Sequence, residues 1–320
     1  MLYPLTFHPI FKERPWGGRR LQELYGKPLP PGVPVGESWE ISARPDDASV
    51  IANGPLAGKD LHWLMQTHTQ EVLGDSHSRP GWFPLLVKLL DAREKLSLQV
   101  HPPAARAAQL AGEPKTEMWY IADAVPGAEL YVGLKHGVTR EAFERRIAAG
   151  TVADCFHRIP VRPGDAMFLP SGRVHAIGAG LVIFEIQQNS DTTYRVFDWN
   201  RVGLDGKPRQ LHVAESLASI DFEDFEPGLV PRAGRTEQPL QSRSLVDDSL
   251  FTVEALTASA RSSRPVAGRL TIVGVVEGQA TVTGAGHLVR LVKGRFCLVP
   301  ATVAAEVALE AGATALLAQA

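Results

Sequence analysis

The sequence predicts a mainly β protein with two β-barrel or jelly-roll lobes, the first enlarged by short helices. Its 320 residues, 44% of them hydrophobic, are enough to bury a substantial core and to form two lobes. Proline and glycine punctuate the first hundred residues, as expected where turns join short strands. From Leu250 to Ala320, short β-branched runs alternate with Gly and Pro turns, which is typical of an antiparallel sandwich. We place the lobes at residues 1–235 and 236–320, with the Pro/Gly/acid-rich segment 221–235 as the crossing between them.

Charge and composition exclude several classes of partner. Lys and Arg total 33 against 35 Asp and Glu, for a net charge of −2, and no basic stripe is interleaved with aromatics, so we expect no nucleic acid partner. No run of about 18 apolar residues is present, so we expect no membrane partner. Cys155 and Cys297 match no Cys-x-x-Cys pattern, which indicates reduced thiols, and residues 1–5 lack the features of a signal peptide. These features predict a cytoplasmic protein.

Sequence patterns predict three helices and a buried strand in the first lobe. Apolar residues recur at helical spacing over residues 59–74, and the final Gly is a C-terminal stop signal. The alanine-rich segment 103–112 and the segment 139–150, which begins with Thr and ends with Gly, predict two more helices. The apolar run 83–90 predicts a strand, in which Lys88 either extends its charge to the edge or faces a cleft.

The run Leu96–Pro102 carries the first candidate site residues. In a strand, side chains two apart share a face, so Ser97, Gln99 and His101 point one way and the apolar residues point the other. A single His on a strand is more often a hydrogen-bonded core residue than a ligand. This run therefore indicates a site only in combination with other motifs.

The decisive motif runs from Gly164 to His175. It fits the pattern Gly-x5-Pro-x-Gly-x2-His at all four fixed positions, Gly164, Pro170, Gly172 and His175. This pattern resembles the second motif of the cupin family. Four placed residues are far more specific than a single His.

A looser version of the first cupin motif lies upstream. Gln99-x-His101 is followed sixteen residues later by Glu117. Members of the family commonly have His-x-His at the first pair, so Gln99 is a departure. Two imidazoles and one carboxylate, with an amide oxygen as a fourth donor, suit Zn²⁺ or another borderline divalent ion. We expect one metal ion per chain, held by Gln99, His101, Glu117 and His175.

More of the chain resembles the short bacterial form of the type I mannose-6-phosphate isomerases, also called phosphomannose isomerases. The matching segments are 96–102, 115–121 and 169–201, and the similarity extends through 16–18 and 36–40. The resemblance covers residues 1–215 well and the remainder loosely.

This resemblance implies a set of site residues. Gln99, His101, Glu117 and His175 would hold zinc, Arg195 would be the active-site arginine, and Ser97, Lys115, Glu185 and Asp191 would line the pocket. Longer members carry a His immediately before the Lys of the Lys-x-Glu segment, where this chain has Pro114. A mechanism that uses that His as the base therefore does not apply here.

The implied reaction interconverts mannose 6-phosphate and fructose 6-phosphate through an enediolate. A divalent metal stabilises the developing charge as a Lewis acid, and acid–base groups move a proton between C1 and C2. Lys115, beside Glu117, is a candidate point charge for the phosphate, and Ser97 is a candidate hydroxyl donor. Arg195 can stabilise either the enediolate or the phosphate, but its permanent charge makes it a poor proton shuttle. For the base we favour Glu185 over Asp191, with a metal-bound water as the alternative.

Two other functions are compatible with a cupin. One is a non-haem metal oxygenase, but Lys115 together with Arg195 favours an anionic sugar as substrate. The other is a non-catalytic cupin that binds sugar phosphate, against which the polar groups of Glu185, Asp191 and Arg195 argue.

We expect the C-terminal lobe to be a cupin without a metal. Gly294 to Pro300 repeats the Gly-x5-Pro spacing, but Ala305 falls where His175 stands in the first lobe. The only histidine after residue 245 is His287, so a site with several ligands has almost nothing to build from.

Overall fold

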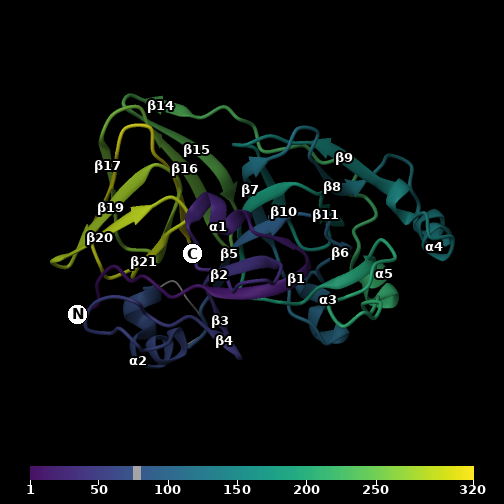
Figure 1. Ribbon diagram of the computed structural model, residues 1–320, viewed down its shortest axis with the longest axis horizontal. Coiled ribbons are helices and arrows are strands. Elements are labelled where there is room, and N and C mark those ends of the chain that lie inside the picture. The colour runs from purple at the N-terminus through teal and green to yellow at the C-terminus, as the bar shows by residue number, and fades with distance from the viewer. Residues whose placement is uncertain (75–80) are drawn as a thin grey trace.

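The computed structural model describes residues 1–74 and 81–320, with the backbone alone at 235–237. It is mainly β, as predicted, and neighbouring strands in its sheets are antiparallel. Figure 1 shows the strands of residues 240–320 grouped on one side of the molecule and those of the first lobe on the other.

The first lobe is built on two sheets, and the chain passes between them several times from β5 onward. One sheet has the order β1 (Ile10–Gly18), β2 (Val35–Ile41), β5 (Leu85–Ala92), β12 (Leu181–Gln188), β7 (Glu117–Ala124) and β10 (Ala166–Leu169). The other has the order β13 (Tyr194–Phe197), β6 (Leu98–Val100), β11 (His175–Ile177), β8 (Glu129–Leu134) and β9 (Phe156–Pro160). A small separate pair consists of β3 (Ala43–Arg44) and β4 (Asp47–Ala48).

The C-terminal lobe also has two sheets. The larger one has the order β14 (Arg235–Glu237), β15 (Leu240–Asp247), β16 (Thr252–Ala258), β23 (Thr314–Gln319), β18 (Thr271–Glu277) and β21 (Phe296–Val299). The smaller one has the order β17 (Ser262–Val266), β22 (Ala305–Leu309), β19 (Gln279–Gly284) and β20 (His287–Val292). The expectation that this lobe is β and not helical is therefore confirmed.

Short helices enlarge the first lobe. They are α1 (Arg20–Tyr25), α2 (Leu61–Leu73), α3 (Ala104–Ala107), α4 (Arg140–Ala148) and α5 (Val213–Ser219), with 3₁₀ turns at Ala108–Leu110 and Val152–Cys155. The carboxylate of Asp60 caps α2 by accepting a 2.7 Å bond from the Trp63 N–H, and the hydroxyl of Thr139 caps α4. The helices predicted over 59–74, 103–112 and 139–150 are confirmed. Among the described residues no helix is both long and apolar enough to cross a bilayer.

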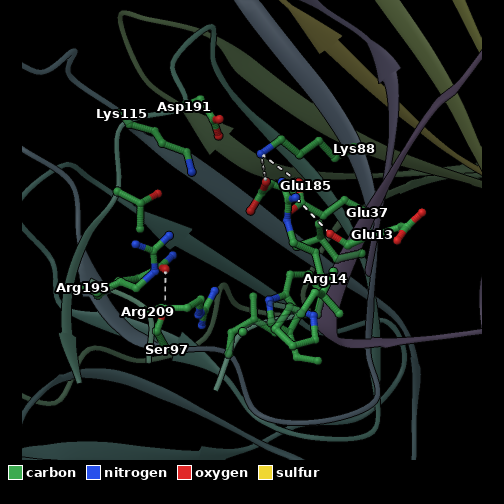
Figure 2. Close-up of a pocket in the computed structure, with 18 of the residues that line it drawn as sticks. Glu13, Arg14, Glu37, Lys88, Ser97, Lys115, Glu185, Asp191, Arg195 and Arg209 are labelled. Carbon is green, nitrogen blue, oxygen red and sulfur yellow. Dashed lines mark hydrogen bonds and ion pairs between the residues drawn. The ribbon is translucent and has the colours of Figure 1, made fainter. Parts of the chain in front are cut away.

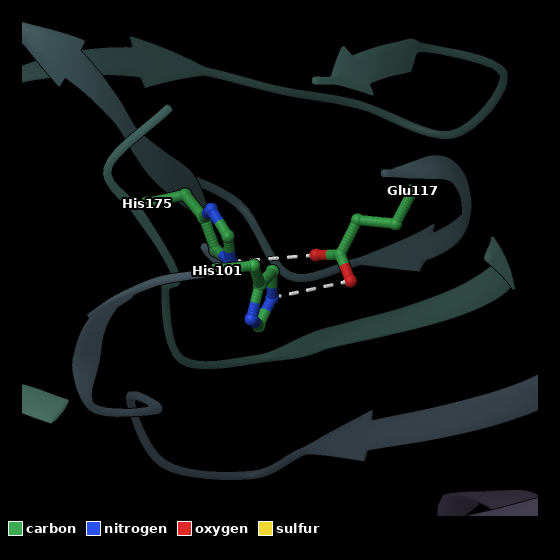
Figure 3. Close-up of side chains that lie close together, drawn as sticks. All are labelled: His101, Glu117 and His175. Carbon is green, nitrogen blue, oxygen red and sulfur yellow. Dashed lines mark ion pairs between the residues drawn. The ribbon is translucent and has the colours of Figure 1, made fainter. Parts of the chain in front are cut away.

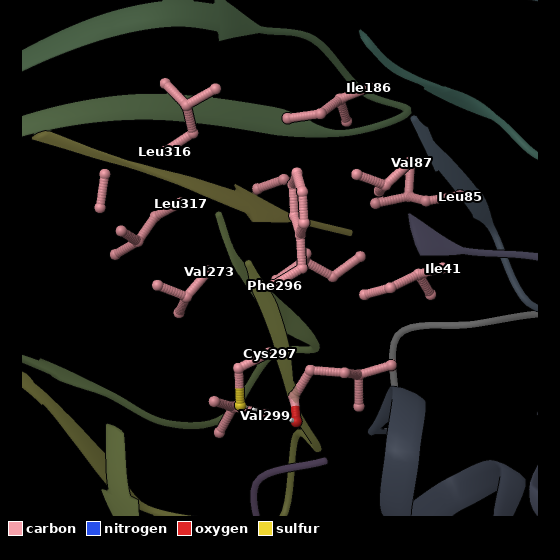
Figure 4. Close-up of a cluster of buried hydrophobic side chains, with 14 of the residues drawn as sticks. Ile41, Leu85, Val87, Ile186, Val273, Phe296, Cys297, Val299, Leu316 and Leu317 are labelled. Atoms are coloured by element: carbon pink, nitrogen blue, oxygen red, sulfur yellow. Dashed lines mark hydrogen bonds between the residues drawn. The ribbon is translucent and has the colours of Figure 1, made fainter. Parts of the chain in front are cut away.

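One hydrophobic core joins the two lobes. Figure 4 shows side chains from β2, β5 and β12 packed against others from β18, β21 and β23. Phe184 of β12 contacts Phe296 of β21, with ring centroids 5.4 Å apart. Leu5 and Leu298 exchange two backbone hydrogen bonds of 2.8 Å, which ties the N-terminal segment to β21. The apolar surface of each lobe is therefore covered by the other.

The segment 221–234 crosses between the lobes without forming a helix or a strand of any sheet. Its Val230 N–H donates a 2.9 Å bond to the Ala166 carbonyl, and Arg232 donates to the carboxylate of Asp165 at 2.8 Å. The division into domains at 235/236 stays a prediction.

Removing Phe296 tests the shared core. Because the side chain is 6% exposed and packs across the junction, we expect Phe296→Ala to lower the free energy of unfolding by about 3–5 kcal/mol. Leu288→Ala is the control, since Leu288 is 57% exposed, and should change it by less than about 0.5 kcal/mol. Urea unfolding followed by circular dichroism measures both. Equal effects of the two substitutions would contradict a core that joins the lobes.

Candidate active site

Three of the predicted metal ligands meet at the ends of three strands. His101 directly follows β6, Glu117 begins β7 and His175 begins β11. The strand register also pairs Gln99 of β6 with His175. The strand is shorter than the predicted 96–102 and spans only Leu98–Val100. On its C-terminal side, Pro102 has no N–H with which to continue the hydrogen-bond ladder.

The three side chains form a compact and fully buried cluster. His101 Nε2 lies 3.4 Å from Glu117 Oε2, and His175 Nε2 lies 3.3 Å from Glu117 Oε1. Figure 3 shows both imidazoles turned toward the same carboxylate. One ligand atom from each residue lies within 4.8 Å of the others, and this is the only such group of acidic, His and Cys side chains found among the described residues.

Backbone carbonyls fix the orientation of both imidazoles. His101 Nδ1 donates to the Thr192 carbonyl at 2.8 Å, and His175 Nδ1 donates to the Arg173 carbonyl at 2.9 Å. The proton is therefore on Nδ1, and the lone pair of each Nε2 is directed at the carboxylate, as in metal sites. Burial lowers the pKa of His175 to about 3, despite the nearby charge of Glu117, so this imidazole is neutral at pH 7.

These residues fit a divalent metal ion. His101 Nε2 and both carboxylate oxygens of Glu117 are buried without a hydrogen-bond partner among the described residues. The lone pairs of the two imidazoles face a negatively charged carboxylate in a buried site and repel it unless a cation lies between them. The donor set of two nitrogens and one carboxylate suits zinc and leaves positions for further ligands.

Gln99 stands beside the cluster as the predicted fourth donor. Its Nε2 lies 3.2 Å from His175 Nε2, while its Oε1 accepts a 3.3 Å bond from the hydroxyl of Ser97. The amide nitrogen has no lone pair to offer a metal, so ligation requires the amide to turn and present Oε1. Its role as a ligand stays a prediction.

A pocket of about 560 Å³ adjoins the cluster, a volume typical of small-molecule sites. Its lining includes all the predicted pocket residues, namely Ser97, Lys115, Glu185, Asp191 and Arg195, together with Gln99. Lys115 is only 4% exposed, and its Nζ lies 3.1 Å from Glu117 Oε2. Lys115 and Glu117 are thus a buried pair at the metal end of the pocket.

A row of alternating charges forms one wall of this pocket. Lys88 Nζ lies 3.2 Å from Glu185 and 3.8 Å from Glu37, and Arg14 Nε donates to Glu37 at 2.6 Å. Burial alone would raise the pKa of Glu37, but the charges of Lys88 and Arg14 hold it at about 2. Of the two positions that the sequence allowed for Lys88, the structure therefore shows the one facing a cleft.

Glu185 has the properties of an acid–base group. It is buried, and one of its oxygens accepts a 2.9 Å bond from the indole N–H of Trp119. Burial raises the pKa of Glu185 above its ordinary value, although the Lys88 ammonium acts in the opposite direction. Asp191 also lines the pocket but is exposed, whereas Glu185 is buried, and its burial raises its pKa.

Arg195 brings an uncompensated positive charge to the pocket. β13 pairs with β6 so that Arg195 lies opposite Gln99, and the buried Nε has no partner among the described residues. Figure 2 shows Arg195, Arg209 and Ser97 on one side of the pocket, with Arg14 and Glu37 on the other.

Known proteins resemble this chain over almost its entire length. Residues 5–137 match the model of the phosphomannose isomerase type I catalytic domain. A probable mannose-6-phosphate isomerase of Bacillus subtilis, GmuF, is 36% identical over 94% of each chain. The mannose-6-phosphate isomerase of Streptococcus mutans is 37% identical over 95% of this chain and 94% of its own. The chain belongs to the type I phosphomannose isomerase family.

Solved structures agree with this membership. The mannose 6-phosphate isomerase of Bacillus subtilis superposes with a TM-score of 0.89 at 31% identity, covering 99% of each chain. A zinc-bound mannose 6-phosphate isomerase shares the fold with a TM-score of 0.79 at 18% identity, covering 99% of this chain and all of its own.

Sequence reasoning missed several residues of this phosphomannose isomerase pocket. Arg14 and Glu37 lie in the segments 11–18 and 36–42, and the mixture of Trp, Gly and charged residues in these segments was the available signal. Arg209 lies in a Gly- and Pro-containing loop with no motif around it. Only the fold brings that loop to the pocket.

Neutralising the central carboxylate tests the metal site. We expect Glu117→Gln to lower zinc affinity by more than about 100-fold, since loss of groups that only support a ligand already costs 10- to 100-fold. Zinc content by elemental analysis and zinc titration of the metal-free protein measure this. Glu144→Gln on the exposed face of α4 is the control and should bind zinc like the wild type. Stoichiometric zinc retained by Glu117→Gln would contradict the assignment.

Proposed function

We propose that this chain catalyses the interconversion of mannose 6-phosphate and fructose 6-phosphate. The observation that supports this most is a buried His101–Glu117–His175 cluster beside a pocket whose lining includes a buried carboxylate with a raised pKa, that of Glu185, and the uncompensated guanidinium of Arg195. Moving a carbonyl between C1 and C2 of a sugar phosphate needs all three. The first stabilises charge, the second moves a proton, and the third binds an anion.

Glu185 is the general base in this proposal. It takes the proton from C2 of mannose 6-phosphate and returns it to C1 of the resulting enediolate, while the hydroxyl proton of O2 passes to O1, which yields the ketose. His101, Glu117 and His175, with Gln99 assisting, would hold a zinc ion, which would supply Lewis-acid stabilisation of the negative charge that develops. Hydrogen bonding to Trp119 and the ion pair with Lys88 hold the carboxylate of Glu185 in one position.

The remaining residues bind and orient the sugar. From the sequence, Lys115 is the candidate point charge for the phosphate, but its ammonium lies 3.1 Å from Glu117 Oε2, so in this proposal it serves the end of the sugar that reacts. The hydroxyl of Ser97 lies 3.3 Å from Gln99 Oε1 at the same pocket and is a donor for sugar oxygens. Arg195 carries five donors and no acceptor and keeps its charge, so it binds anionic oxygens and does not shuttle protons.

The two alternative functions explain the pocket less well. A protein that only binds sugar phosphate has no use for a buried carboxylate whose pKa is raised toward neutrality. A metal oxygenase needs open positions for O₂ but not a wall of cationic groups suited to a phosphate. We place the reaction in the cytoplasm, because both cysteines are free and buried and the reaction uses phosphorylated sugars.

An isomerase assay on the zinc-loaded protein tests the function. We expect conversion of mannose 6-phosphate to fructose 6-phosphate by the wild type, and a kcat lower by about 100- to 10,000-fold in Glu185→Gln with zinc content unchanged. Because the base must be ionised, kcat/KM of the wild type should fall as the pH decreases through a value above the ordinary glutamate pKa of about 4.3.

Two further variants make this test specific. Asp191→Asn should keep most of the kcat if Glu185 is the base, and Glu144→Gln should match the wild type. A zinc-loaded wild type that does not isomerise mannose 6-phosphate would contradict the function. A Glu185→Gln variant with wild-type kcat would contradict the assignment of the base.

A further inference from the structure

Arg44 does not line the pocket, and the reaction proposed above gives it no role. It lies in β3 of the small β3–β4 pair, and its side chain is 16% exposed. The Ser49 N–H donates to the Ser42 carbonyl at 2.8 Å, and the Ser42 N–H donates to the Ser49 hydroxyl at 2.9 Å. His62 of α2 adds a contact, because its Nε2 lies 3.1 Å from the Arg44 carbonyl oxygen. The backbone of Arg44 is therefore fixed by its own strand pair and by α2.

The guanidinium of Arg44 bridges two segments that are distant in the sequence. Its Nη1 donates a 2.7 Å hydrogen bond to the Asn189 carbonyl and lies 2.8 Å from Glu113 Oε2. Arg44 thus joins the segment 188–192 to the segment 112–116. Both segments carry residues of the pocket lining.

Hydrogen bonds also connect the two segments directly. The Glu113 N–H donates to the Thr192 hydroxyl at 2.9 Å. The Thr116 N–H donates to Gln188 Oε1 at 2.9 Å, and the Gln188 N–H donates to the Thr116 carbonyl at 3.0 Å. The two segments therefore form one hydrogen-bonded unit, in which a displacement of Glu113 is passed to Thr192.

The two partners of Arg44 differ in how firmly they are held. Asn189 is 2% exposed, and its backbone and side-chain N–H groups donate to the carbonyls of Pro84 at 2.9 Å and Phe83 at 3.0 Å, so it stays in place without Arg44. The side chain of Glu113 is 39% exposed, and among the described residues Arg44 is its only ion-pair partner. Without the guanidinium, this carboxylate is better solvated by turning to water. Arg44 therefore fixes Glu113 and, with it, the segment 112–116.

Two parts of the site depend on this unit. The Thr192 carbonyl accepts the 2.8 Å hydrogen bond that orients His101. Lys115 follows Glu113 by two residues, and its ammonium lies at the metal end of the pocket. We propose that Arg44 is a positioning residue. It acts through Glu113 to hold the Thr192 carbonyl and Lys115 in place. This inference rests on the metal site and, for its effect on turnover, on the proposed function.

Zinc titration and kinetics of Arg44→Gln test the proposal. We expect a zinc affinity lower by about 3- to 10-fold. This is less than the 10- to 100-fold typical when a group bonded to a ligand is itself lost, because Arg44 acts through Thr192. In the zinc-loaded variant, kcat should fall by about 10- to 100-fold, since small displacements of reacting groups are costly. The midpoint of thermal unfolding should change by less than about 4 °C, because a partly exposed ion pair contributes little to stability.

Hydrogen exchange followed by NMR gives a readout that needs neither zinc nor activity. In metal-free Arg44→Gln, the Glu113 amide should exchange at least about fivefold faster than in the wild type, because this segment is no longer held. The Asn189 amide is the internal control and should exchange within about twofold of the wild-type rate. A purely structural ion pair would lower the unfolding midpoint but leave Glu113 exchange and zinc affinity unchanged, and this result would overturn the proposal.

Matched variants make the test specific. Glu113→Gln should reproduce the changes, and the double variant Arg44→Gln/Glu113→Gln should be no worse than either single variant, since each removes the same interaction. Arg140→Gln and Glu144→Gln break an exposed ion pair of α4 and should leave zinc affinity and kcat unchanged.

The outcomes separate this inference from the proposed function. A wild type that binds zinc but does not isomerise mannose 6-phosphate overturns the function, while zinc affinity and exchange still decide the role of Arg44. If the wild type does not bind zinc, exchange of the Glu113 amide decides alone. If Arg44→Gln does not fold, the same measurements on Glu113→Gln decide. Wild-type zinc affinity and exchange at position 113 would overturn the proposal, and lower affinity with faster exchange would support it.

Discussion

The burial of the Glu117 carboxylate is the constraint on which the rest of the site depends. The side chain is 0% exposed, and neither oxygen has a hydrogen-bond partner within the described residues. An isolated carboxylate in such a place would become protonated, because removing its charge from water costs several kcal/mol. Burial raises the pKa of Glu117, but the nearby charge of Lys115 contributes most in the opposite direction, and the pKa lies well below its ordinary value. Residues brought together from three segments of the chain thus meet around one charge.

The same principle organises the pocket beyond the cluster. Glu37, Lys88 and Glu185 are all buried and alternate in sign, so each charge is stabilised by its neighbour. Removing one of these side chains would leave its partner's charge buried and uncompensated. The exception is the side of Arg195 and Arg209, where positive charge exceeds negative charge. The cations Arg14, Lys88 and Lys115 are paired with carboxylates, so an anionic ligand is attracted to the side of the pocket where positive charge is in excess.

Much of the fold and of the candidate site could be predicted from the sequence, because local patterns determine these parts. The helix over 59–74 has its cap and its glycine stop in the sequence, and the spacing of the motif from Gly164 to His175 was enough to single out His175 as a candidate ligand. The ends of the strand around Gln99 could not be predicted as well, because they depend on where the partner strands β11 and β13 stop. Arg209 could not be found at all, because no motif surrounds it and only the fold brings its loop to the pocket. The core shared by the two lobes was also not predicted, because alternating apolar residues show that a face is buried but not what covers it.

Locating the metal ion is the most direct test of the role given to the buried Glu117 carboxylate. Crystals of the zinc-loaded protein, measured on both sides of the zinc absorption edge, give the position from anomalous scattering. We predict one anomalous peak per chain, within coordination distance of His101 Nε2, His175 Nε2 and the Glu117 carboxylate. A peak among residues after 245, or no peak beside Glu117, would contradict the view that this buried carboxylate exists to hold a metal.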